Sequence, residues 1–229
     1  MTFITIDNLT THYDTSKGKV HALDNVSFSL EKGQSIGIAG ESACGKSTLG
    51  LSLIRMIPNG KIIAGKIIFD GKSLLEIPDS EFDKKHRWND ISMVFQGAMN
   101  SLDPVFTIKE QFVEILKEHK FNDDIDRTIL DSLSSVNLED IVLQKYPHEL
   151  SGGMKQRVII AMALLLKPKF VIADEPTTAL DVLIQAQLMN LFKKLKKDGM
   201  TLMIISHDLG VLSEVAEKIG IMYLSLIHI

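Results

Sequence analysis

The segment 40–48 has the residue types and spacing of a phosphate-binding loop. It reads GESACGKST and fits the pattern G-x-x-x-x-G-K-[ST]. Gly40 and Gly45 allow backbone N–H groups to turn toward a phosphate, and a helix that begins near Lys46 adds the positive end of its dipole. Lys46 supplies charge for the outer phosphates, and the Ser47 hydroxyl is a ligand for Mg²⁺. We therefore expect ATP and Mg²⁺ to bind here, at Gly40, Glu41, Ser42, Ala43, Cys44, Gly45, Lys46, Ser47 and Thr48.

Polar side chains also follow three apolar segments that are typical of buried strands. Asp174 and Glu175 follow one such segment, Gln96 a second, and His207 a third. Ligands of open α/β sheets bind beyond the carboxyl ends of the strands, so these groups can converge on the phosphate loop. We expect Asp174 to hold Mg²⁺ and Glu175 to act as general base toward the attacking water.

Gln96 and His207 each allow two interpretations. Gln96 could be a neutral ligand of the metal or the water that senses the γ-phosphate, or simply a structural amide at the end of a strand. His207 could hydrogen-bond the γ-phosphate or orient Glu175, although a single histidine is more often structural. Its position at a strand end distinguishes His207 from the other histidines of the chain.

A second anion-binding helix start is predicted at 150–157, which reads LSGGMKQR. Ser151 is typical of an N-cap, and Gly152 and Gly153 would expose bare amides at the start of the helix. The simpler interpretation is a capped helix without a ligand. A second such helix start beside a single phosphate loop raises the question of whose phosphate it binds.

The pattern of apolar residues predicts an α/β fold that could position these groups. Alternation over 3–30 predicts antiparallel strands around a turn at 14–18. Short apolar segments predict strands at 34–39, 66–69, 91–95, 170–173 and 201–205, the last of these being the final clear strand. Helical spacing predicts helices at 48–57, 108–119, 124–136, 138–145, 151–166 and 182–197.

Composition restricts the classes of protein to consider. The chain has 229 residues, of which 45% are hydrophobic and 24% are charged, as in a soluble globular protein. A net charge of −4 gives no reason to expect a nucleic-acid partner. The single cysteine excludes an internal disulfide framework and fits a reducing compartment. No secretory signal and no apolar run long enough to span a bilayer are found, so any membrane role would be peripheral.

Together the motifs resemble those of the ATP-binding cassette (ABC) ATPases. They occur in the family's order, up to about Tyr223: GESACGKST, Phe95-Gln96, LSGGMKQR, FVIADEP, 178–181 and 205–208. The resemblance implies one cassette with a P-loop NTPase-type, mostly parallel sheet as its core, at about 1–96 and 156–223. It also implies an N-terminal antiparallel β subdomain and an inserted helical subdomain at about 97–155. The end at 224–229 is expected to be irregular.

The same resemblance implies a partner cassette. In this family two cassettes pair head to tail, and the LSGG helix of one contacts the γ-phosphate bound by the other. Carried over by motif, Asp181 lies at the dimer seam, and the groups that act in trans are Ser151, Gly152, Gly153 and Gln156. Tyr13 stands where the family stacks an aromatic ring on adenine, although a plain strand tyrosine is the alternative.

Finer features resemble the importer subunits for dipeptides, oligopeptides and nickel, at 96–104, 146–149 and 181–187. This group implies a peripheral ATPase at the cytoplasmic face of the membrane, bound to integral membrane permease subunits. Met99, Leu102 and Phe106 could anchor the permease, or could equally be core contacts of the helical subdomain.

Two rivals remain from the sequence. A soluble cassette protein acting on DNA or the ribosome usually has two cassettes or a long coiled-coil insertion, and this chain shows neither. A monomeric P-loop kinase has no need of the LSGG segment or of His207.

The chain departs from the family at Ala43 and at 224–229, and Cys44 raises a separate question. Ala43 replaces the usual glycine, which is costly only where φ is positive, and we expect little damage. Cys44, beside Lys46 at a helix start, could be reactive, with ATP protecting it from maleimide, or could be an inert loop residue. Segment 224–229 matches no continuation of the family, so a truncated or artefactual end is expected.

Overall fold

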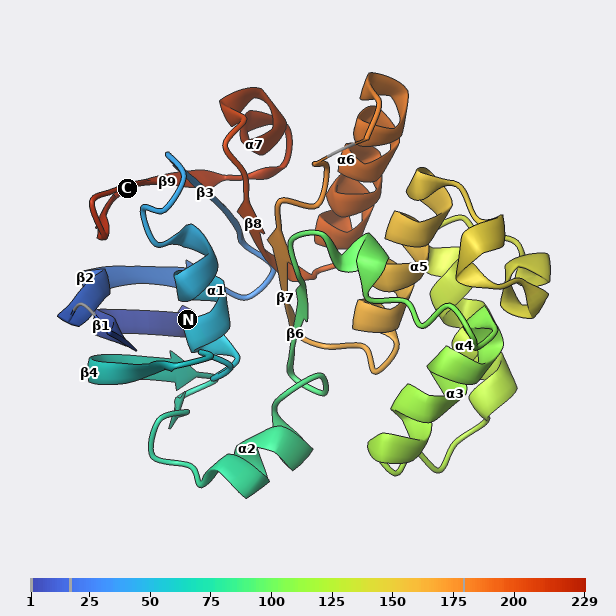
Figure 1. Ribbon diagram of the computed structural model, residues 1–229, viewed down its shortest axis with the longest axis horizontal. Coiled ribbons are helices and arrows are strands. Elements are labelled where there is room, and N and C mark those ends of the chain that lie inside the picture. Colours follow the sequence, from blue (N-terminus) through green and yellow to red (C-terminus); the bar gives the residue numbers. More distant parts are fainter. Residues whose placement is uncertain (1, 17, 179) are drawn as a thin grey trace.

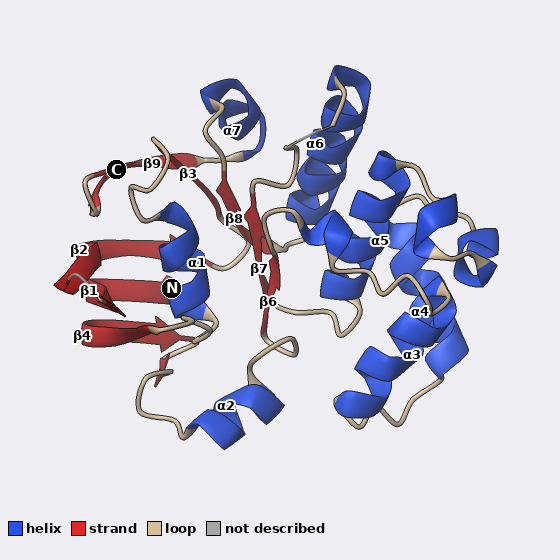
Figure 2. Ribbon diagram, in the orientation of Figure 1, coloured by secondary structure: helices blue, strands red, loops and turns tan. Residues whose placement is uncertain are grey.

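The computed structural model describes residues 2–16, 18–178 and 180–229 of the chain. Figure 1 shows a group of antiparallel strands at one side, a second sheet through the middle, and a group of helices beyond it. Most of the helical residues lie on the side of the second sheet away from the antiparallel strands (Figure 2). The predicted fold class, a mostly parallel sheet combined with an antiparallel β part and a helical part, is confirmed.

The antiparallel sheet is built on two long strands whose buried and exposed residues alternate. β1 pairs with β2 on one edge and with β4 on the other, which confirms the strands predicted over 3–30. Of the predicted turn between them, Lys17 lies outside the described residues. The sheet has the order β2-β1-β4-β5, with the bounds β1 Thr2–Thr15, β2 Gly18–Glu31, β4 Gly60–Phe69 and β5 Lys72–Ser73.

The second sheet has the strand order β10-β9-β3-β8-β7-β6. Every neighbouring pair from β9 to β6 is parallel, and only β10 runs antiparallel, to β9. The strands are β3 Ser35–Gly40, β6 Ile91–Val94, β7 Phe170–Asp174, β8 Thr201–Ile205, β9 Lys218–Tyr223 and β10 Leu226–His228. The parallel pairing brings the carboxyl ends of β3, β8, β7 and β6 to one edge of the sheet.

Each face of this sheet packs into its own core. On β7, Val171 and Ala173 join one core, whereas Phe170 and Ile172 join the other. The first core includes the inner residues of α5 and α6, and the second includes those of α1 and of the antiparallel sheet. Because both faces are covered, β7 and β8 are buried along their whole length, and β7 is apolar up to its final residue, Asp174.

The helices follow the apolar periodicity of the sequence. Within the part of the chain that the structure describes, no helix combines the length and apolar character needed to cross a bilayer. The α-helices are α1 Lys46–Leu53, α2 Asp79–Lys85, α3 Ile108–Glu118, α4 Ile125–Ser135, α5 Gly152–Leu164, α6 Val182–Lys197 and α7 Leu209–Val215. Three short 3₁₀ helices are η1 Ala98–Asn100, η2 Asp140–Gln144 and η3 Pro147–Glu149.

Four sequence expectations are corrected. The helix expected at 138–145 is the 3₁₀ helix η2, and α1 ends at Leu53 because Arg55 adopts the left-handed region, with φ 56°. A further strand follows the one expected to be last, since β9 pairs with β3. The end at 224–229 is not irregular, because β10 forms a hairpin with β9.

Candidate functional site

The phosphate loop leaves β3 at Gly40 and enters α1 at Lys46. Gly40 and Gly45 have φ of 153° and 104°, in the region that favours glycine. A Cβ on Gly45 would lie 2.2 Å from the Ala22 carbonyl oxygen, so no larger residue fits there without moving the backbone. The two glycines therefore let the chain close tightly around the space in front of the helix.

That space is positively polarised. Gly45 is the N-cap of α1 and provides no side-chain hydrogen bond, so the first amides of the helix are not capped by it. Lys46 is buried, and its Nζ donates to the carbonyl oxygens of Gly40, at 2.7 Å, and Glu41, at 2.6 Å. An anion in the loop would accept from the same amides and exchange for these carbonyls, which is the chemistry expected of a phosphate cradle.

Two neighbouring residues correct the sequence interpretation. Ala43 has φ 63°, which is the positive φ at which a side chain is costly. Its methyl group is therefore strained, contrary to the expectation of little damage. Cys44 is buried, with its Sγ 3.8 Å from Lys46 Nζ, so a thiol reagent has poor access to it. The inert interpretation of Cys44 is the better supported one.

Asp174 ends β7 and carries the features of a metal ligand. The residue is only 2% exposed, and its Oδ1 has no hydrogen-bond partner among the described residues. Burial raises the pKa of the Asp174 carboxyl above its usual range, while a hydrogen bond with Ser47 acts in the opposite direction. A buried carboxylate oxygen left unpaired beside a hydroxyl is a fitting place for Mg²⁺, which prefers such oxygen ligands.

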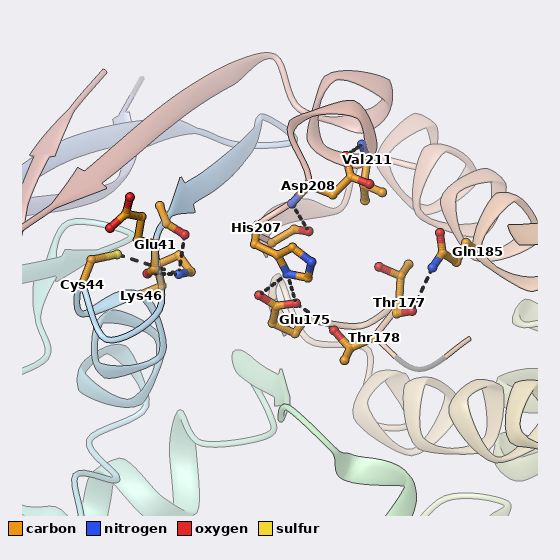
Figure 3. A network of polar contacts seen from close by, with 12 residues as sticks. Glu41, Cys44, Lys46, Glu175, Thr177, Thr178, Gln185, His207, Asp208 and Val211 are labelled. Carbon is orange, nitrogen blue, oxygen red and sulfur yellow. Dashed lines mark hydrogen bonds and ion pairs between the residues drawn. The ribbon is translucent and has the colours of Figure 1, made fainter. Parts of the chain in front are cut away.

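Glu175 and His207 meet at the carboxyl ends of β7 and β8 (Figure 3). His207 Nδ1 donates to the carboxylate at 2.8 Å from Oε2 and 3.0 Å from Oε1. Glu175 has φ 49°, an uncommon backbone conformation held by a hydrogen bond from its N–H to the Ile205 oxygen at 2.9 Å. The Glu175 side chain is mostly buried, whereas that of His207 is 69% exposed. The geometry joins the two residues, as in one of the two functional interpretations of His207 left open by the sequence.

Thr178 also contacts Glu175, and the sequence interpretation did not single it out. Its Oγ1 donates to Glu175 Oε2 at 2.7 Å. The available signal was its spacing, because a hydroxyl three residues after an acid can reach back across a turn. Ala179, the next residue of the same motif, lies outside the described residues.

Gln96 and Tyr13 lie at the border of the site and do not contact Asp174 or Glu175 in the hydrogen bonds of the described residues. Gln96 is exposed just beyond β6, at the same edge of the sheet as Asp174. The Tyr13 hydroxyl lies 3.3 Å from Thr48 Oγ1, so the ring stands beside α1 and the loop. Both side chains lie in the predicted neighbourhood.

The second helix start is formed as predicted at Ser151 and Gly152, but Gly153 and Gln156 are buried. Ser151 caps α5 by accepting from the Met154 amide at 3.3 Å, and Gly152 is exposed. Gly153 faces α6, where a Cβ would lie 2.9 Å from a methyl carbon of Ile184. Gln156 is only 4% exposed, so its position does not support the expected contact with a partner's nucleotide.

The starts of α1 and α5, the two expected anion-binding sites, do not face a common site within the chain. α1 belongs to the core on one face of the parallel sheet and α5 to the core on the other, and the helices stand apart in Figure 1. Asp181 caps α6 by accepting from the Ile184 amide at 3.0 Å and is itself exposed. The start of α5 is thus available to a ligand from outside the chain.

We predict that Ala43→Gly stabilises the chain by about 1 kcal/mol, because glycine removes the strain of a left-handed alanine. The control is Ala186→Gly on exposed turns of α6, which should lose about 1 kcal/mol because glycine is a poor helix former. Urea unfolding measures both changes. Equal losses in the two variants would contradict the strain at Ala43.

We also predict that Asp174→Asn stabilises the nucleotide-free chain at pH 7. Since the pKa of Asp174 is raised in the folded chain, its ionisation lowers stability as pH rises, and the effect is absent below the unfolded value of 3.8. The Tm difference from wild type should therefore be positive at pH 7 and vanish as pH falls toward that value. Mg-ATP should raise the Tm of wild type more than that of the variant.

Asp123→Asn, a change at an exposed carboxyl, is the matched control and should show neither effect. A lower Tm for Asp174→Asn at pH 7 would contradict the account of the buried charge.

Comparison with known proteins agrees with this geometry. The family model for the ABC transporter matches residues 23–178. The dipeptide transport ATP-binding protein DppD of Bacillus subtilis is 42% identical over 227 residues, which cover 96% of this chain and 68% of the relative. The oligopeptide transport ATP-binding protein OppD of Haemophilus influenzae is 43% identical over 227 residues, which cover 95% of this chain and 69% of the relative.

Solved structures show the same fold. A dimeric post-hydrolysis state of the ATP-binding cassette MJ0796, bound to ADP and Pi, has a TM-score of 0.86 at 29% identity and covers 99% of this chain and 97% of that one. CbiO1 from Clostridium perfringens, part of the ABC transporter complex cbiONQ, has a TM-score of 0.84 at 25% identity, covering 100% and 87%. The family model matches most of this chain, and the named relatives align with nearly all of it. The chain therefore belongs to the ABC transporter family.

Proposed function

We propose that this chain is the ATP-hydrolysing subunit of an ABC importer for dipeptides or oligopeptides. The observation that carries the proposal is the convergence of the phosphate loop, Asp174, Glu175 and His207 at one edge of the parallel sheet. The relatives named for dipeptide and oligopeptide transport, aligned over nearly all of this chain, support the cargo class. In this proposal the chain is a single cassette, with 97–155 as its helical subdomain.

Each residue of the site has a distinct task in the proposed reaction. The loop amides and Lys46 would bind the β- and γ-phosphates, and Tyr13, whose hydroxyl lies beside Thr48, would stack on the adenine ring. Ser47, Asp174 and Gln96 would hold Mg²⁺, which supplies neutralisation of the phosphate charge when bound. Glu175 accepts a proton from the attacking water, and His207 orients the Glu175 carboxylate through its Nδ1–H.

The start of α5 supports a second cassette as partner. Its exposed end lies away from the loop of its own chain, so a γ-phosphate for Ser151 and Gly152 would come from another cassette. The similar cassette MJ0796 is known as a dimer bound to ADP and Pi, which gives a precedent for pairing of two cassettes. Val182 and Leu183, next to Asp181, are 81% and 68% exposed and provide apolar surface for the seam.

Membrane attachment would come through integral permease subunits, which place the chain peripherally at the cytoplasmic face. The loop after Gln96 offers exposed apolar side chains at Val105 and Phe106, and Met99 is half-buried. Leu102 is buried in the core, so of the three anchors expected from the sequence it is the one to exclude. Action on DNA or the ribosome is not favoured, because the relatives reported above are named for peptide transport.

We predict that Glu175→Gln lowers ATP turnover by about 10²–10⁴-fold, the usual worth of general base catalysis, while ATP still binds. Glutamine keeps the shape of the side chain but cannot accept the proton of the water. Steady-state phosphate release measures turnover, and equilibrium binding of a fluorescent ATP analogue measures affinity.

The matched control is Glu214→Gln, at an exposed ion pair between Lys193 on α6 and Glu214 on α7, and this variant should hydrolyse ATP like wild type. Turnover of Glu175→Gln near the wild-type value would assign the base to another residue.

A further inference from the structure

We propose that Thr178 is a positioning residue whose hydroxyl fixes the orientation of the Glu175 carboxylate for proton transfer. This inference rests on the proposed function, in which Glu175 is the general base. The direct observation is the 2.7 Å hydrogen bond from Thr178 Oγ1 to Glu175 Oε2. Hydrogen bonds to an ionised acceptor are among the stronger ones in proteins, so this contact can select one orientation of the carboxylate.

The hydroxyl is held in place by its turn. The Thr178 amide donates to the Glu175 oxygen at 3.2 Å, which closes the turn that brings the two side chains together. The Gln185 side-chain amide on α6 donates to the Thr177 carbonyl at 3.3 Å (Figure 3). The same amide also donates to the Leu180 carbonyl, at 3.1 Å. The position of the Thr178 hydroxyl is thus set by α6 and the backbone, although the residue itself is exposed.

The two carboxylate oxygens are consequently not equivalent. Among the described residues, Oε2 accepts from both Thr178 and His207, whereas Oε1 accepts only from His207, at 3.0 Å. Oε1 therefore retains more lone-pair capacity for an incoming water. In the proposed step the water oxygen bonds to the γ-phosphorus, the bond to the leaving ADP oxygen breaks, and the water proton moves to Oε1 while Thr178 keeps its own.

Thr178 and His207 differ in how they reach the base. His207 comes from the end of β8 and is 69% exposed, so its ring depends on a separate element. Thr178 lies on the same turn as Glu175, which the bond from its own amide closes. The Thr178 hydroxyl therefore orients the Glu175 carboxylate through a bond that does not depend on the His207 ring.

The test compares Thr178→Val with Thr178→Ser in the full chain. Valine keeps the branched shape but lacks the hydroxyl, so kcat should fall about tenfold while ATP affinity stays unchanged. Serine retains the donor and should restore kcat to within about twofold of wild type. Thr128→Val, the same chemical change at a hydroxyl on α4 that bonds the Asp124 carbonyl, is the matched control and should leave kcat unchanged.

A double-mutant cycle separates this role from a structural one. If Thr178 acts through the base, Thr178→Val should cause no further loss in the Glu175→Gln background. An unchanged kcat in Thr178→Val, an equal loss in Thr178→Ser, or a full additional loss in the double variant would each overturn the inference. Wild-type turnover in Glu175→Gln alone would instead overturn the base assignment on which the inference rests.

Discussion

The parallel hydrogen-bond ladder through β3, β8, β7 and β6 is the constraint on which the rest of the site depends. Because these strands run in one direction, their carboxyl ends share an edge, and the phosphate loop, Asp174, Glu175 and His207 lie beyond it. The ladder continues into the site, since the Glu175 amide still bonds the Ile205 oxygen at the end of β8. Backbone pairing with β8 thus fixes the position of Glu175 independently of its side-chain contacts.

The same arrangement leaves charged groups of the site without their ligands when no nucleotide is bound. Asp174 is buried, and its Oδ1 has no hydrogen-bond partner in the part of the chain that the structure describes. Lys46 bonds to carbonyl oxygens of its own loop. A bound Mg-nucleotide would relieve both, because the cation would meet the carboxylate and the phosphates would meet the lysine and the helix amides. We infer that nucleotide binding stabilises the chain chiefly by satisfying groups that the sheet has already placed.

Much of the site was predictable because its residue types are unusual where they occur. Two glycines and a lysine before a helix, or two acids after an apolar strand, are recognisable from the residue types alone. In the structure Lys46 begins α1 and Glu175 follows β7. The positive φ of Ala43 and the burial of Gln156 depend on how neighbouring elements pack, which spacing does not encode. β9 was not predicted because its apolar run is short and is interrupted by Gly220, although pairing with β3 fixes it as a strand.

The central claim is that one cassette completes its site with the start of α5 from a second cassette. The most direct measurement is the solution mass of Glu175→Gln by light scattering, first with Mg-ATP and then with ADP. The account predicts a dimer with Mg-ATP and a monomer with ADP, and loss of the dimer on adding Gly152→Asp, which places a negative charge at the exposed helix start. A monomer in both nucleotides, with ATP binding intact, would contradict pairing between copies of this chain.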